Sequence, residues 1–326
     1  GIYERDLSSH KERPLVENTL VKGMCVNCHA FNRTDEPFQS SHPRNAWTTF
    51  MRTDNKDEYL NTKTDQTIAA CSIPTGIPEA NNSVFHEQHP TIVHTVKDER
   101  VEVLDLESDI VVYHPADHRL LLCDSLQKKD RFETFPAFSP DGRTLYFCSA
   151  EAKKIPEEYK EIRYNLCSID FDPSAGTFGS RIDTLVNAEA LGKSVSFPAL
   201  PMTANILCSP YPITELFDRH KEANLWLLDL TSGDLRELSE VNSDDTESFH
   251  NWSSNSRWFV FSSRRGDGLY TRLYLASMDE NGKISKPFLL PQEDTETYYD
   301  RSVYSYNVPD FTSEPIKIDT RYLKRR

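Results

Sequence analysis

Short apolar runs separated by polar turns recur along most of the chain. The runs at 165–170, 224–229 and 271–276 are rich in Leu, Ile, Cys and Tyr, and Asp, Asn, Ser or Thr bound them. Thr231-Ser232-Gly233-Asp234 reads as a hairpin turn between two such runs. Helical periodicity is scarce, and the best short helix is expected near 157–161. The pattern predicts an all-β protein of short antiparallel strands.

One of these units is repeated. The segment from Phe135 to Ser149 aligns without a gap on the segment from Phe249 to Ser263, and 197–209 is a shorter copy with a degenerate turn. Each copy is followed by a further strand, so the unit recurs every ~50–60 residues with about four strands, which is the period of a propeller blade. Five to six such units fit between about residue 60 and the C-terminus. The sequence therefore predicts a β-propeller.

Two regions are expected from this spacing. Residues 1–60 are expected to form a short irregular N-terminal segment, and residues 61–326 the propeller of four-stranded antiparallel blades. Between 38 and 94 the turn signature is missing, and Cys71 to Pro78 stands where a blade turn is expected. The blade in that region is expected to be irregular.

Charge and composition exclude several classes of protein. Lys and Arg number 37 against 51 Asp and Glu, which gives a formal net charge of -14, so nucleic acid is not expected as a partner. No apolar run approaches the ~20 residues that span a bilayer. The first residues have no charged region leading into an apolar one, so a signal segment is expected to be absent from this chain. Four of the seven cysteines, Cys123, Cys148, Cys167 and Cys208, lie in strand-like runs and are expected to be buried free thiols.

The chemistry that the sequence indicates most directly is at Cys25-Val26-Asn27-Cys28-His29. Two thiols followed at once by an imidazole have the spacing for covalent attachment of c-type haem, with His29 as the proximal iron ligand. The competing interpretations are a plain dithiol, a short-loop disulfide or half of a zinc site. Zinc is disfavoured because no second Cys-x-x-Cys follows.

A second axial ligand is expected if haem binds. Met51 and His42 follow His29 closely enough for the N-terminal segment to fold over a haem, and His86, His89 and His94 form a further group. Each of these residues also has an ordinary structural interpretation, as a surface histidine or a methionine filling a core gap.

Other candidate sites are weaker. Asp244 to Glu247 together with His250 suggest a metal or hydrolytic site, but the segment leads directly into a blade strand, which favours a structural role. Neither a Gly-x-Ser-x-Gly elbow nor a glycine-rich phosphate loop occurs among only 11 glycines, so a hydrolase is not expected.

The turn Phe138-Ser139-Pro140-Asp141-Gly142-Arg143 resembles the repeat of TolB-like six-bladed propellers. Cys25 to Phe31 ahead of such repeats resembles a group of Bacteroidetes TolB-like proteins that are often labelled cytochrome c biogenesis or WD-type repeat proteins. The segments most similar to this group are 97–103, 133–136, 242–248 and 291–294. The resemblance implies six blades and an exported protein, periplasmic or associated with the outer membrane, with a lipid anchor upstream as an option. It implies no reaction.

These observations lead to one expectation with two alternatives. We expect an exported, non-catalytic propeller that binds a protein or a surface ligand on its face and carries a haem c site at Cys25, Cys28 and His29. The first alternative is a c-type haem electron-transfer protein. The second is a propeller enzyme that acts on glycan or peptide.

The haem assignment predicts a covalent mass increase. Protein made in a host with the c-type maturation machinery is expected to carry one haem that resists acid-acetone extraction, measured by intact mass and visible spectrum, and Cys25→Ala with Cys28→Ala is expected to remove it. Wild-type protein from such a host with neither the added mass nor a haem spectrum would contradict the assignment.

Overall fold

The computed structural model describes most of the chain as β-strands. The described residues are 1–19, 29–31, 38–42, 47–51, 57–61, 67–72, 83–95, 100–114, 119–155, 157–203, 205–210 and 220–316. Side chains are described for 1–19, 108–110, 112 and, with few gaps, from 121 to 316. No described helix is long and apolar enough to cross a bilayer.

The strands form six antiparallel sheets among these residues. The first is a hairpin of β1 (Ile2–Arg5) and β2 (Glu12–Val16). The others follow in chain order, each sheet holding consecutive strands: β3 (His29–Phe31), β4 (Phe38–His42), β5 (Trp47–Met51), β6 (Asp57–Asn61); β7 (Thr67–Ser72), β8 (Ser83–Thr95), β9 (Arg100–His114), β10 (Arg119–Leu121); β11 (Arg131–Phe138), β12 (Thr144–Glu151), β13 (Asn165–Asp172), β14 (Thr177–Val186); β15 (Asn205–Cys208), β16 (Trp226–Asp229), β17 (Leu235–Glu237); β18 (Glu247–Trp252), β19 (Trp258–Ser263), β20 (Arg272–Ser277), β21 (Phe288–Leu289).

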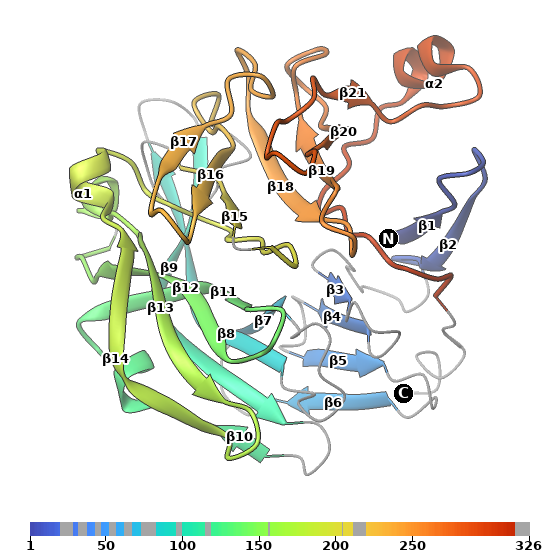
Figure 1. Cartoon of the computed structure of the whole chain (residues 1–326). Coiled ribbons are helices and arrows are strands. Elements are labelled where there is room, and N and C mark those ends of the chain that lie inside the picture. The colour runs from blue at the N-terminus through green and yellow to red at the C-terminus, as the bar shows by residue number, and fades with distance from the viewer. Residues whose placement is uncertain are drawn as a thin grey trace.

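The sheets are arranged around a common centre, as Figure 1 shows. In each of the five larger sheets the first strand lies nearest the centre and the last strand lies outermost, which is the arrangement of propeller blades. The predicted propeller of antiparallel blades is therefore confirmed. The number six is not confirmed, because the described strands make five sheets of three or four strands and one two-stranded hairpin.

The N-terminal region differs from the expectation. Residues 1–60 were expected to be irregular, yet the described part holds the hairpin β1–β2 and the strands β3 to β6. The expected boundary near residue 60 falls at the end of β6, where one four-stranded sheet ends and the next begins. These strands were not predicted because the sequence before residue 60 lacks the serine-based turn by which the later blades were recognised.

The repeated turn explains why two copies align without a gap. Ser139 Oγ accepts hydrogen bonds from the backbone N–H groups of Arg143 (3.1 Å) and Thr144 (2.9 Å), and thereby closes the β11–β12 turn. Ser253 does the same in the β18–β19 turn, accepting from Trp258 N–H at 3.0 Å. The third, degenerate copy is also present, since Ala199 and Leu207 form a β-bridge.

The core consists of layers between neighbouring blades. Ile110 and Val112 of β9 pack with Phe147 and Ile169 of the next sheet. Corresponding layers lie between β11–β14 and β15–β17, and between β15–β17 and β18–β21, where Trp252 is fully buried. Cys167 and Cys208 are buried free thiols in these layers, and Cys148 is a buried free thiol in a separate cluster with Phe132, Phe135 and Tyr164. The prediction of buried free thiols is confirmed for these three, whereas Cys123 is only partly buried. Burial raises the pKa of the Cys148 thiol well above its usual value, so it is unreactive at neutral pH.

The short helices lie outside this framework. They are 3-10 turns at Asp124–Leu126 and at Tyr159–Glu161, where a short helix was expected, and α-helices α1 (Ala188–Leu191) and α2 (Thr295–Arg301). After α2 the chain returns across the last blade. Ser262 Oγ donates to the Asn307 carbonyl (2.6 Å), and Asn251 Nδ2 donates to Asp310 Oδ1 (2.6 Å).

Arg272 holds the start of this returning segment. Its guanidinium is 4% exposed and donates to the carbonyl oxygens of Tyr304, Ser302 (2.8 Å) and Tyr299 (3.3 Å). It also lies against the Tyr299 ring, 5.4 Å from the centroid. One buried cation thus satisfies three carbonyls of an irregular segment.

Replacing this cation is expected to destabilise the fold. Arg272→Met leaves three carbonyls without their charged donor and should lower the free energy of unfolding by about 2–4 kcal/mol, measured by urea denaturation. Arg257→Met is the matched control, because Arg257 is about half exposed with one distant ion pair and should change stability by less than ~0.5 kcal/mol. Equal effects of the two substitutions would refute this role for Arg272.

Candidate functional site

Three phenylalanines occupy corresponding positions in consecutive blades. Phe135 lies on β11 and Phe249 on β18, and Phe197 lies two residues before Ala199, which bridges to Leu207 of β15. Phe135, Phe197 and Phe249 have backbone φ angles of 49°, 49° and 36°, in the left-handed region that disfavours residues other than glycine. Strand pairing shifts at this point between Thr134 and Ala137, and a matching shift occurs in β18, so Phe135 and Phe249 each lie in a β-bulge. The repeat thus imposes one unusual backbone geometry three times.

The three rings contact one another across the blades. The ring centroids of Phe135 and Phe197 are 4.1 Å apart, and those of Phe197 and Phe249 are 5.6 Å apart in an edge-to-face arrangement. Phe135 is 8% exposed and packs against Tyr164, whereas Phe197 and Phe249 are half-buried and pack on Ala223. We call these three residues the aromatic arc.

A buried carboxylate stands two residues before two of these phenylalanines. Glu133 and Glu247 are 1% and 0% exposed, and each is paired across the blade with a serine, Ser149 or Ser263. The burial of these two carboxylates was not predicted from the sequence, because the serine that pairs with each of them comes from the next strand. The repeat itself is the signal that could have identified it.

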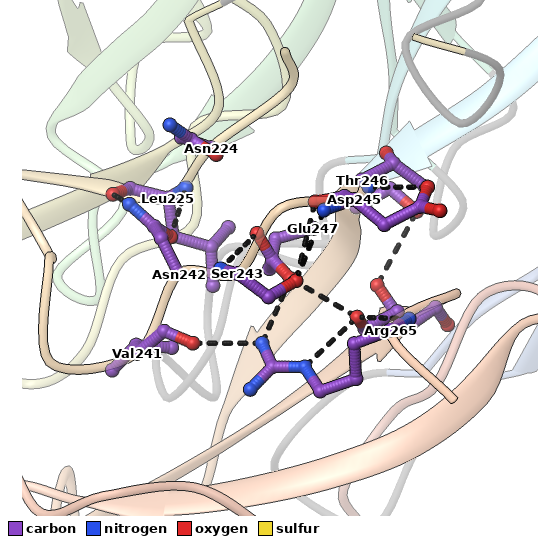
Figure 2. Close-up of polar contacts among 12 residues, drawn as sticks. Asn224, Leu225, Val241, Asn242, Ser243, Asp245, Thr246, Glu247 and Arg265 are labelled. Atoms are coloured by element: carbon purple, nitrogen blue, oxygen red, sulfur yellow. Dashed lines mark hydrogen bonds and ion pairs between the residues drawn. The ribbon is translucent and has the colours of Figure 1, made fainter. Parts of the chain in front are cut away.

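Glu247 is fully satisfied by its own blade and the preceding turn. Its carboxylate accepts from Ser243 N–H (3.1 Å), Ser243 Oγ (2.6 Å), Ser263 Oγ (3.0 Å) and Arg265 Nη2 (2.8 Å), as Figure 2 shows in part. Arg265 also donates to the Val241 carbonyl at 2.7 Å. Burial raises the pKa of Glu247, and the serine hydrogen bonds and Arg265 oppose that rise. This network joins the strands of one blade.

Glu133 has a poorer environment. Arg131 Nε donates to Ser149 Oγ at 2.9 Å and lies 3.9 Å from Glu133 Oε1, while Ser149 Oγ donates to Glu133 Oε1 at 3.4 Å. The second carboxylate oxygen, Oε2, is buried without a hydrogen-bond partner. Burial, together with the charge of Asp109, raises the pKa of Glu133 to about 7. Glu133 is therefore largely protonated below neutral pH.

The acidic segment 244–247 and His250 do not share partners. His250 stands where the other two copies have proline, is 7% exposed, and its Nε2 lies 3.1 Å from the Leu207 carbonyl of the neighbouring blade. Burial lowers the pKa of His250 to about 4, so the ring is neutral and donates from Nε2. Among the side chains that the structure describes, no three His, Cys, Asp or Glu residues form a metal-binding group. The hydrogen bonds of Glu247 within its blade and of His250 to the neighbouring blade agree with the structural interpretation of this segment.

The predicted haem residues are only partly within the described chain. Cys25 and Cys28 lie outside it. His29, His42 and Met51 are described as backbone only, in three neighbouring strands where they pair with Ser40, Trp47 and Phe38. His86, His89 and His94 lie in β8. The haem assignment and both axial candidates stay predictions.

His29 and His250 differ in strand register. His29 pairs with Ser40 of β4, whereas His250 falls within the register shift between Ser248 and Asn251 of β18. Both histidines lie on the first strand of their sheet.

The raised pKa of Glu133 predicts how the stability of the protein depends on pH. Its pKa is raised from 4.5 to about 7, so its stabilising contribution is present below pH 4.5 and is lost as the pH rises toward 7. Glu133→Gln should therefore be more stable than the wild type at pH 8, by at most about 3 kcal/mol, with the difference vanishing near pH 4.5. Urea denaturation at both pH values measures this.

The control for Glu133 lies on the same pair of strands. Glu151→Gln removes an exposed carboxylate, paired only with Lys153, and should change stability little at either pH. A Glu133→Gln protein that is less stable than the wild type at pH 8 would show that the charged form is the favoured one.

Comparisons with known proteins bear on the fold. The sequence matches no family model and no curated protein. Among solved structures, it is similar to a protein described as TolB from Agrobacterium tumefaciens, with a TM-score of 0.54 and 14% identity over 86% of this chain and 84% of that one. It is also similar to an oligogalacturonate lyase from Vibrio parahaemolyticus, with a TM-score of 0.51 and 8% identity over 82% of this chain and 67% of that one.

An oligogalacturonate lyase in complex with manganese gives the same TM-score, 0.51, at 10% identity over 81% of this chain and 67% of that one. At such low identity these likenesses establish the fold and leave the activity open. The chain has a TolB-like β-propeller fold.

Proposed function

We propose that this chain is an exported, non-catalytic propeller that binds a partner protein over the aromatic arc. The observation that carries the proposal is the threefold repetition of a phenylalanine in left-handed backbone. Each such residue costs of order 1–3 kcal/mol, and glycine would relieve the strain. Phe135 is buried and supports the neighbouring ring of Phe197, whereas Phe197 and Phe249 are half-buried, which suits a surface on which these two rings are needed.

The arc has the chemistry of a binding hot spot. Phe197 and Phe249 are half-buried, so part of each residue is accessible, and each ring packs against another ring of the arc. Rigid aromatic rings near the centre of an interface lose little entropy on binding and commonly dominate affinity. Buried carboxylates beside the arc are held within the blades, as Glu247 is by Arg265, which favours binding over acid–base chemistry.

Covalent haem at Cys25, Cys28 and His29 remains part of the proposal as a separate feature. If bound, it would supply electron transfer. The partner-binding proposal stands on the arc and does not require the haem.

Removing exposed ring area is expected to weaken partner binding. With a partner isolated from the native source, Phe197→Ala and Phe249→Ala should each raise the dissociation constant about 30-fold, because losing a hot-spot side chain costs roughly 2 kcal/mol or more. Calorimetric titration measures the constant, and urea denaturation checks that the variants are folded.

Phe288→Ala is the matched control for this experiment. Phe288 is 43% exposed on the outermost strand β21, away from the inner strands, so its loss should leave the affinity unchanged. Affinity that falls equally in all three variants, or in none, would contradict binding at the arc. Turnover of oligogalacturonate or peptides by the wild type would favour the enzyme alternative instead.

A further inference from the structure

A groove separates the hairpin β1–β2 from the last blade. It encloses about 1010 Å³, and its lining comes from residues 1–19 and 260–316. Leu15, Val260, Leu275 and Leu290 line it as buried apolar side chains, and Tyr304, which also lines it, is 76% exposed. Figure 1 shows the hairpin beside the sheet of β18 to β21. The groove is distinct from the aromatic arc.

The charge of the lining is strongly one-sided. Six carboxylates line the groove, and Arg5 is the single cationic side chain among its lining residues; the six are Glu4, Asp6, Glu12, Glu17, Asp310 and Glu314. The Arg5 guanidinium donates to the Pro291 carbonyl, and its Nε and Nη1 atoms are buried without hydrogen-bond partners. Because carboxylates dominate the lining, an occupant should be basic.

The hairpin β1–β2 is a smaller sheet than the others. The other described sheets hold three or four strands, whereas β1 and β2 pair only with each other among the described residues. A two-stranded sheet is marginally stable by itself, and its outer edges present unpaired N–H and C=O groups that accept an added strand. An extended segment that pairs with an edge of the hairpin would therefore suit the groove.

The chain itself supplies such a segment at the edge of the groove. The backbone of Ile316 is fixed there, with its N–H donating to Glu4 Oε1 (2.6 Å) and its carbonyl accepting from Arg13 Nη2 (2.6 Å). Residues 317–326 lie outside the described part of the chain. Their sequence holds five Lys or Arg and one Asp, a net charge of +4, and alternates as a strand does through Ile316, Ile318, Thr320 and Tyr322.

We propose that residues 317–326 bind in this groove as a strand added to the hairpin β1–β2. The alternate side chains Ile318 and Tyr322 contact the apolar lining, and the basic residues pair with the carboxylates. Because the segment is attached at Ile316, its effective concentration at the groove is of order millimolar, so a weak intrinsic affinity is enough to hold it. The attraction between exposed charges weakens as salt screens it.

Amide hydrogen exchange on the full chain tests this proposal. At about 0.02 M ionic strength, amides within 318–323 should exchange at least about tenfold more slowly than in the free decapeptide of residues 317–326, and about 0.5 M salt should reduce the protection. Glu12→Lys with Glu17→Lys should abolish it. Adding Lys324→Glu, Arg325→Glu and Arg326→Glu to that variant should restore it.

A control variant tests whether the protection depends on charges in the groove. Glu157→Lys with Glu158→Lys places the same charges in a loop of another blade and should leave the protection intact. Exchange at the free-peptide rate in the wild type would overturn the proposal. Protection that appears only as the protein concentration rises would also overturn it, because the occupant would then be a second copy of the chain.

Discussion

The inner-strand bulge is the constraint on which the rest of this structure depends. An extra residue at Phe135, and again at Phe249, shifts the pairing register of the strand. Three residues later, Phe138 and Trp252 lie in the core between blades and are 6% and 0% exposed. Within the aromatic arc Phe135 is also buried, in a different cluster from Phe138, whereas Phe197 and Phe249 are half-buried. The backbone strain at each phenylalanine is tolerated because the strands on both sides fix its geometry.

The parts of the fold that depend on local chemistry were predictable from the sequence. The Ser139 and Ser253 turns are short-range hydrogen-bond motifs, so their residues reveal them, and the degenerate copy at 197–209 was recognised by alignment to them. The strands before residue 60 were missed because pairing between strands, rather than a turn signature, defines them. The left-handed phenylalanines were missed for a related reason. Nothing in a Phe-Pro or Phe-His pair signals positive φ, which is imposed by the partner strand.

The candidate site was predicted less well than the fold, since a site depends on which strands become neighbours. The structural role of 244–247 could be inferred from its position before a strand. The hydrogen bond from Arg265 to Glu247 could not be inferred, because it depends on how the chain folds. The haem assignment at His29 rests on the spacing of Cys-x-x-Cys-His in the sequence.

A propeller shared with lyases does not make this chain an enzyme, because one fold supports unrelated functions through different side chains at the same place. Catalysis by a carboxylate requires the group to reach a substrate and to exchange protons with it. Glu247 has its carboxylate engaged by two serines and one arginine, and Glu133 is 1% exposed. What the inner strands do present to a partner is aromatic surface on Phe197 and Phe249, held rigidly by contacts between the rings. Rigid apolar surface with carboxylates withdrawn beneath it is suited to binding a protein, and this distinction between exposed rings and buried acids is the physical basis for the proposed function.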